Sequence, residues 1–460
     1  MKVLLIYILF LITNRYGKCF HSLVPSKSLL SHKHSIFMER LNKISLPEND
    51  PALKFGLGSV AFSLLPLSPE STGRRKTILT EVVKEKVWTL DQLQGIINVN
   101  VPVRSTIVKL KDGLWINNPV GPTPECISII RTLEQSHGKV KYILLSTLGI
   151  EHKGTASVFS RFFSSASIWI QPGQYSFPIN LPTNLFFPFG KSISTIPYNS
   201  SQAPWNDEID HLVLKPLVPK GVGGFSETAF FHKETKTLLV TDIIIKITAE
   251  PPAIIQDDPR ALLYHARKNM MEIITDTPGN RRIGWRRMVL FGLVFMPGGI
   301  KITDTFEAIK MLKDAPVEMK VLGEGAIPYD GGLYPWDWIE DDKPSFDAIA
   351  GGLLVAPIIR YLIVNREPQQ VLEWVDNVCK WPFERIIPCH LDNDIKARPA
   401  DFRAAFRFLE EPVSWPFNLL EKPVLTPLPK DRKTLEEVSV LLTEQGVLKE
   451  EAPLMKRKRK

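Results

Sequence analysis

The order of apolar and polar positions predicts an α/β fold for the body of the chain, between residues 86 and 411. Short runs in which nearly every residue is apolar, such as Val140–Ser146, are typical of strands that are buried on both faces. Cys126–His137 instead has apolar residues three or four positions apart and is followed by Gly138, which predicts an amphipathic helix and its end. Because such strands and helices alternate, we expect layered sheets covered by helices.

These patterns predict individual elements along the whole body. Strands are expected at Arg104–Leu110, Leu114–Asn117, Val140–Ser146, Ser167–Gln171, His211–Leu217, Glu227–His232, Thr237–Thr241 and Arg385–Pro388. Helices are expected at Cys126–His137, Thr155–Phe163, Ala261–Ile274, Phe306–Leu312, Gln369–Lys380, Ala400–Leu409 and Lys433–Glu444. The apolar stretch Phe291–Met296 fits either a core helix or an insert that contacts a membrane. Residues 412–460 are expected to form a Pro-rich, helical and basic tail.

Composition and charge narrow the class of protein. The chain has 460 residues, of which 44% are hydrophobic and 23% charged, so a sizeable core is possible. The net charge of +8 comes from the two ends, which leaves the body close to neutral. A nucleic-acid-binding core keeps its positive charge in the folded body, so we expect no nucleic-acid partner. The four cysteines include no CxxC pair, which favours a reducing compartment.

The N-terminal segment is typical of a targeting sequence. Residues 1–19 have a lysine followed by the apolar run Val3–Ile12, as in a signal peptide. Residues 20–80 begin with a stretch rich in Ser, Lys and His that resembles a transit peptide, followed by a linker. Together they resemble a bipartite plastid import sequence, and the alternative is a plain secreted protein. The apolar stretch Phe55–Leu67 is too short for a confident membrane helix and leaves peripheral membrane association open.

Three predicted strands end on side chains that can bind a metal ion. The first is followed by the segment that contains Glu151 and His152, the second ends at Asp242, and the third ends at Cys389-His390. In open α/β folds, sites collect where strands end at one edge of a sheet. A carboxylate and imidazoles from separate strand ends could therefore meet and hold a cation. Cys389 and His390 are adjacent on a strand and point to opposite faces, which argues against a thiol–histidine pair.

The order of these residues resembles the metallo-β-lactamase superfamily, in which a strand is followed by T-H-x-H-x-D-H. Thr147 matches the leading threonine, and Glu151-His152 matches the Asp-His pair after a one-residue deletion. Asp242 matches the aspartate that can bridge two metals, and His390 matches the last histidine. The resemblance implies a four-layer αββα sandwich, here with C-terminal helical additions, and metal-dependent hydrolysis.

Several positions depart from that superfamily. Leu148 and Ile150 stand where the first two histidines belong, and Pro219–Gly224 has no histidine where the superfamily has P-G-H-T. Asn118 lies where the superfamily often has Asp-x-Gly. The ligands of the first metal are therefore missing, whereas most of those for the second are present. The resemblance implies at most one divalent cation (Zn, Fe or Mn) bound by Glu151, His152, Asp242 and His390, and leaves open that none binds.

Longer strings resemble the plastid and cyanobacterial family called domain of unknown function 4336. They are Val87–Gly95, Asn98–Arg104, Pro172–Pro178, Gly351–Pro357 and Trp381–Pro388. This resemblance covers residues 86–411 and implies a fold and a compartment but no activity. Two hypotheses remain open: a one-metal hydrolase of an ester or similar bond, and a non-catalytic binding or assembly protein at plastid membranes. The small-molecule ligand or protein partner is not identified by the sequence.

Overall fold

The computed structural model describes most of the chain from Lys76 onward. The described residues are 76–96, 99–175, 192–217, 224–304, 307, 310–311, 334–412 and 423–457. The signal peptide expected at 1–19 and nearly all of the segment expected at 20–80 lie outside them, as does most of the helix expected at Phe306–Leu312. Among the described helices, none combines the length and apolar character needed to cross a bilayer.

Two β-sheets form the centre of the fold. The first sheet contains seven strands in chain order: β1 (Ile78–Val83), β2 (Val87–Ile96), β3 (Val99–Leu110), β4 (Gly113–Asn117), β5 (Val140–Leu145), β6 (Ser167–Ile170) and β7 (Ile193–Thr195). The strands from β1 to β4 are antiparallel, and those from β4 to β7 are parallel. The second sheet has the order β16 (Ile395–Lys396), β15 (Arg385–Ile387), β10 (Thr237–Leu239), β9 (Thr228–His232) and β8 (Ile209–Val213).

Side chains alternate between two faces along these strands and so define four layers. In β4, Trp115 packs between the two sheets, whereas Leu114 and Ile116 pack with α4 (Pro124–His137). The second sheet behaves in the same way, because Phe230 packs between the sheets and Phe231 packs on the outer side. The outer layers are α4 and α5 (Ile150–Ser160) on the first sheet, and α13 (Pro368–Val378) and α14 (Pro399–Ala404) on the second. The αββα sandwich predicted from the sequence is confirmed.

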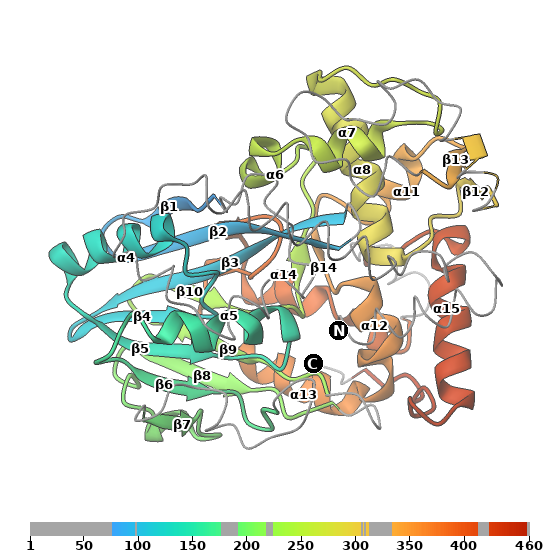
Figure 1. Cartoon of the computed structure of the whole chain (residues 1–460). Helices are drawn as coiled ribbons and strands as arrows, with labels where there is room; N and C mark the ends of the chain where they lie inside the picture. Colours follow the sequence, from blue (N-terminus) through green and yellow to red (C-terminus); the bar gives the residue numbers. More distant parts are fainter. Residues whose placement is uncertain are drawn as a thin grey trace.

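Further helices lie together to one side of the sheets, as Figure 1 shows. They are α7 (Arg260–Ala266), α8 (Pro278–Val294), α11 (Lys343–Asp347), α12 (Pro357–Leu362) and α15 (Pro429–Glu444). The stretch Phe291–Met296 begins inside α8, where the ring of Phe291 packs on Trp336 at 4.7 Å between centroids. That contact supports the core-helix interpretation of this stretch.

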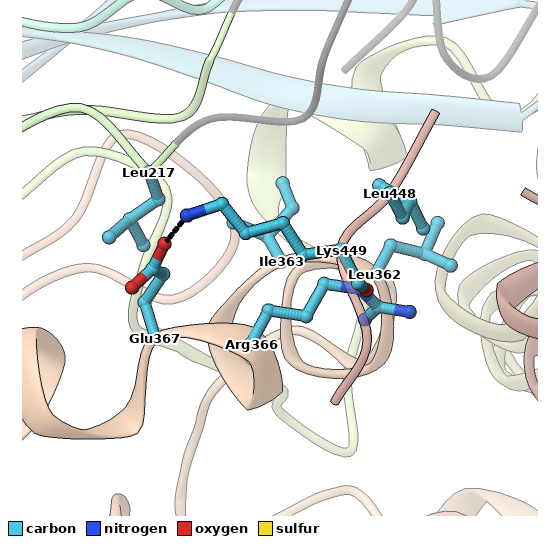
Figure 2. Close-up of a pocket in the computed structure, with 7 residues that line it drawn as sticks. All are labelled: Leu217, Leu362, Ile363, Arg366, Glu367, Leu448 and Lys449. Carbon is cyan, nitrogen blue, oxygen red and sulfur yellow. Dashed lines mark hydrogen bonds and ion pairs between the residues drawn. The ribbon is translucent and has the colours of Figure 1, made fainter. Parts of the chain in front are cut away.

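The C-terminal segment packs on the same core as these helices. Leu435 and Leu442 of α15 are fully buried in it. Arg366 holds the segment in place, because its Nη2 donates to Oγ of Ser439 at 2.7 Å and its Nε donates to the carbonyl of Lys449 at 2.9 Å. Figure 2 shows Arg366 and Lys449 among the residues that line a small pocket, together with the ion pair between Lys449 and Glu367. α15 is therefore a structural part of the domain.

Two differences from the predicted elements bear on the site. β2 and the first half of β3 were not predicted, because polar side chains interrupt their apolar pattern and are nevertheless buried. These side chains are Asp91, Gln92, Gln94, Asn100 and Arg104. The helix predicted at Thr155–Phe163 begins earlier, at Ile150, so Glu151 and His152 lie in its first turn. Gly154 lowers the helix propensity of that turn, which hid the start of the helix in the sequence.

A buried histidine makes the stability of the fold depend on pH. His232 on β9 is fully buried, and burial lowers its pKa to about 4. The unfolded chain binds this proton below its ordinary pKa of about 6.5, whereas the folded chain does not, so stability is complete above that pH and falls as the pH decreases towards 4. We expect His232 to contribute a loss of about 2 kcal/mol in unfolding free energy between pH 7.5 and 5.

Urea unfolding of the wild type and of His232→Gln over this pH range measures that contribution. We expect the variant to show a smaller loss of unfolding free energy on acidification, whatever its absolute stability. Thr132, whose side chain is exposed on α4 and does not titrate, provides a control, because its replacement by Gln should leave the wild-type slope unchanged. Equal slopes for the wild type and His232→Gln would contradict the prediction.

Candidate metal centre

The structure brings together the four residues that the sequence singled out. Glu151 and His152 come from the first turn of α5, Asp242 from the segment after β10, and His390 from the segment after β15. One nitrogen or oxygen atom of each side chain lies within 4.8 Å of those of the other three. The three segments therefore meet at one point, and whether a metal ion binds there stays a prediction.

Asp242 lies at the middle of this cluster. Its Oδ1 is 2.9 Å from Nε2 of His390 and 3.7 Å from Nε2 of His152. The centroids of the two imidazole rings are 5.3 Å apart. His152 is fully buried, Glu151 and Asp242 are at most 5% exposed, and the side chain of His390 is 12% exposed. The cluster is thus almost closed to solvent.

Several buried polar atoms of the cluster lack a hydrogen bond within the described part of the chain. They are Oε2 of Glu151 and both ring nitrogens of His152, whereas Oδ1 of Asp242 and Nε2 of His390 have only each other, at 2.9 Å. Burying polar atoms without partners is unfavourable, and buried atoms of this kind are rare in folded proteins. Imidazole and carboxylate groups are the ligands that Zn, Fe and Mn take in proteins. The residues present therefore fit one divalent cation.

The orientation of His390 suits a metal ligand. Its Nδ1 lies 2.9 Å from the carbonyl oxygen of Pro102 on β3. Since a carbonyl can only accept a hydrogen bond, Nδ1 carries the proton, and the lone pair of the neutral ring is on Nε2. That nitrogen is the one that faces Asp242. The backbone of β3 thus sets both the tautomer and the direction of the ring.

The charges in the cluster depend on one another. Burial alone would raise the pKa of Asp242, but its contacts with His152 and His390 hold that pKa below its ordinary value. Burial would lower the pKa of His390, but the Asp242 carboxylate raises it. Asp242 is therefore ionised, and His390 tends to keep a second proton when no cation is present. A cation and that proton compete for the same nitrogen.

Glu227, which the sequence analysis did not single out, fixes the backbone that carries Asp242. It is fully buried, and its carboxylate accepts hydrogen bonds from the backbone N–H groups of Thr241, Asp242 and Ile243 at 3.1, 2.7 and 2.9 Å. Burial raises the pKa of Glu227 to about 8. The sequence did show an acidic residue at the start of an apolar strand. An acidic residue at an exposed strand end gives the same pattern, so the buried role of Glu227 could not be recognised.

Arg104 holds the segment that carries His390. Its Nη1 donates to the carbonyl of Pro388 at 2.8 Å, and its Nη2 donates to that of Leu391 at 2.9 Å. Its charge is balanced by Asp91, whose Oδ1 is 2.8 Å from Nη2. Leu391 has a φ of +59°, a backbone conformation that branched residues rarely adopt, so the contacts around it must hold it there. The sequence placed Arg104 in a strand but gave no sign of this role.

Asn118 connects the ends of three strands behind the cluster. Its Nδ2 donates to Oγ1 of Thr241 at 3.0 Å, and its Oδ1 accepts from the backbone N–H of Ser146 at 2.9 Å. Nδ2 also lies 3.5 Å from Sγ of Cys389. Burial raises the pKa of the Cys389 thiol to about 12, so the thiol stays protonated. The expectation that Cys389 is not a nucleophile agrees with this placement.

The positions expected for a first metal are apolar in the structure. Leu148 and Ile150 are both buried, and the backbone N–H of Leu148 donates to the carbonyl of Ser226 at 3.0 Å. Among the described residues, the groups that could hold a metal ion are the four of this one cluster. The described structure thus provides ligands for one cation.

Comparisons with known proteins place the chain in a family. Its sequence matches the model of the family described as Domain of unknown function (DUF4336) over residues 84–408. The chain therefore belongs to this family. None of the curated proteins matches the sequence.

Similar solved structures share little sequence with the chain. A metal-soaked Flv1 flavodiiron core from Synechocystis sp. PCC6803 is 9% identical, with a TM-score of 0.36, over 73% of this chain and 60% of that one. A metallo-beta-lactamase from Pontibacter korlensis is 12% identical, with a TM-score of 0.28, over 59% and 98%. The FIM-1 metallo-beta-lactamase of Pseudomonas aeruginosa in its mono-zinc form is 12% identical, with a TM-score of 0.27, over 35% and 67%. At such TM-scores the likeness does not extend to details of the site.

The role of Arg104 can be tested with a substitution that keeps the positive charge but removes the planar guanidinium group. Lysine can still pair with Asp91 but cannot reach two carbonyl groups with a planar fork. We expect Arg104→Lys to weaken metal binding about tenfold, because the groups that orient metal ligands typically contribute that much or more. Competition with a chromophoric chelator measures the affinity.

Arg131 is a matched control for this substitution, because it lies on α4 with an exposed side chain. Arg131→Lys should bind metal as the wild type does. The melting temperature of Arg104→Lys without metal should be measured alongside. If its metal affinity equals that of the wild type, Arg104 does not position His390.

Proposed function

We propose that the chain is a plastid protein that binds one divalent cation at Glu151, His152, Asp242 and His390 and uses it as a one-metal hydrolase of an ester or similar bond. One observation carries the proposal: four buried ligand-type side chains have their nitrogen and oxygen atoms within 4.8 Å of one another, and several of those atoms lack hydrogen bonds. The family match over residues 84–408 supports the domain but adds no activity.

In this proposal, His390, Asp242 and Glu151 each have a separate role. A divalent cation, when bound, would act as a Lewis acid toward a substrate oxygen. His390 is oriented by the Pro102 carbonyl, and Asp242 is held by Glu227, which accepts a hydrogen bond from the backbone N–H of Asp242. Glu151 has two carboxylate oxygens, so one can contact the cation while the other accepts a proton from an attacking water. The burial of the cluster keeps bulk water away from these groups.

A second candidate function is a non-catalytic binding or assembly protein associated with plastid membranes. The near-complete burial of the four side chains favours it, because a metal site with four protein ligands and no open position is typical of structural sites. The two functions differ in whether a substrate can reach the cation. They share the metal site, so metal binding is the first property to measure.

Metal analysis of the purified full-length chain tests the site directly. We expect about one equivalent of Zn, Fe or Mn per chain, and we expect His390→Ala and Asp242→Ala to lose it because each removes a central ligand. His137→Ala and Asp210→Ala are controls, since these residues lie on α4 and β8 and should leave the metal content unchanged. A wild-type chain that takes up none of the three metals would refute the site.

Removal of the metal separates the two functions. For a hydrolase, a chelator should abolish hydrolysis of carboxylic or phosphate esters, and the same metal should restore it. For a structural site, the chelator should lower the melting temperature, and the metal-loaded chain should hydrolyse none of these esters. The variant His390→Ala should behave as the chelated wild type does in either case.

The proposed location in the plastid is based on the sequence of residues 1–80 and can be tested separately. We expect a fluorescent protein fused behind these residues to enter plastids of a cell with secondary plastids. Removal of residues 20–80 should redirect it to the secretory pathway, because the signal peptide alone then remains. Separation of stroma from thylakoid membranes would test peripheral membrane association. Secretion of the fusion that carries all 80 residues would contradict the plastid location.

A further inference from the structure

A buried lysine lies next to the candidate metal centre. Lys153 follows His152 on α5 and is only 2% exposed. Its Nζ donates to the carbonyl oxygen of Tyr175 at 2.5 Å and lies 3.2 Å from the centroid of the Tyr175 ring. Lysine is almost never fully buried unless an acid pairs with it.

Lys153 forms no ion pair with a carboxylate in the part of the chain that the structure describes. Its two contacts are a neutral carbonyl group and an aromatic ring. The sequence adds that residues 176–191, which follow Tyr175, contain neither aspartate nor glutamate. The charge of this ammonium group is therefore not balanced by a partner of its own.

The segment that contains Tyr175 lies beside the start of α5. The residue before Tyr175, Gln174, donates from Nε2 to the carbonyl of Thr147 at 3.1 Å. Oγ1 of Thr147 lies 3.4 Å from Oδ2 of Asp242. The segment that receives Lys153 thus runs beside the same end of α5 that carries Glu151 and His152.

Charge balance at this end of the helix favours a bound anion. A divalent cation is balanced by the carboxylates of Glu151 and Asp242, because histidine ligands are neutral. Lys153, when protonated, then leaves one positive charge in a buried site, which is unfavourable without a counter-charge. The first turn of α5 adds to this, since its N-cap, Gly149, has no side chain that could accept hydrogen bonds from the first N–H groups of the helix.

We propose that Lys153 binds a carboxylate or phosphate group of the substrate, so that the site acts on an anionic substrate. This proposal rests on the one-metal function above and names the substrate class for it. An ammonium group attracts either anion as a point charge, without the two-point geometry that arginine imposes. In this arrangement the anionic group of the substrate replaces the Tyr175 carbonyl as the partner of Lys153.

Titration of the metal-loaded full-length chain with acetate and with inorganic phosphate tests the proposal. Calorimetry should show that the wild type binds at least one of these anions. We expect Lys153→Met to weaken that binding at least about tenfold and Lys153→Arg to retain most of it, because the arginine keeps the charge. Lys139→Met is the control, since the Lys139 side chain is 74% exposed and pairs with Glu134.

The metal content of each variant is measured before any anion is added. A wild type without metal refutes the one-metal function, whereas a metal-loaded chain with weak anion binding refutes only the role of Lys153. Stronger binding of acetate assigns a carboxylate substrate, and stronger binding of phosphate assigns a phosphate ester. Unchanged binding in Lys153→Met, or no binding of either anion to the metal-loaded wild type, overturns the proposal.

A second measurement avoids dependence on the folding of Lys153→Met. The metal-loaded wild type is treated with an acylating reagent, and the extent of acylation at each lysine is determined by mass spectrometry. Phosphate or acetate should slow the acylation of Lys153 and leave that of Lys139 unchanged. Equal acylation of Lys153 with and without the anions would overturn the proposal.

Discussion

The geometry of the candidate site depends on Arg104, which joins the first sheet to the segment that carries His390. This guanidinium is buried, paired with Asp91 and bonded to carbonyl groups of the segment after β15. The backbone N–H of Arg104 also donates to the carbonyl of Cys389 at 2.8 Å. A buried charge of this kind is tolerated only when its donors and its counter-ion are in place. The two sheets therefore meet in one arrangement at this point.

Two polar side chains next to the cluster are fully paired, whereas Glu151 and His152 inside it are not. Glu227 accepts hydrogen bonds from three backbone N–H groups. Asn118 donates one hydrogen bond and accepts another, and so connects three strand ends. Such complete pairing is what a buried polar network needs in order to be stable. Oε2 of Glu151 and both ring nitrogens of His152 have no hydrogen bond in the described part of the chain. Buried ligand-type atoms without hydrogen bonds, next to backbone that is held in place in this way, are the arrangement expected of a metal site.

The sequence predicted the layers and the four residues, because both depend on local patterns. Apolar runs revealed β5, β10 and β15, and the residues that follow them were placed near one sheet edge. It could not predict β2 or the start of β3, whose buried polar side chains gain their partners only in the folded protein. Arg104 and Glu227 were missed for the same reason. Their partners are backbone groups of distant segments, which leave no trace in local sequence.

The apolar residues in the segment that resembles T-H-x-H-x-D-H and the charge of Lys153 both bear on how many positive charges the site holds. Leu148 and Ile150 stand at the positions where the resemblance implies two ligands for a first cation, and both side chains are buried. Lys153 provides one positive charge beside Glu151 and His152. An ammonium group can attract an anion as a metal ion does, but it cannot activate water in the way a metal ion does. In the proposed function, chemistry at this site therefore depends on the one proposed cation, with Lys153 restricted to binding.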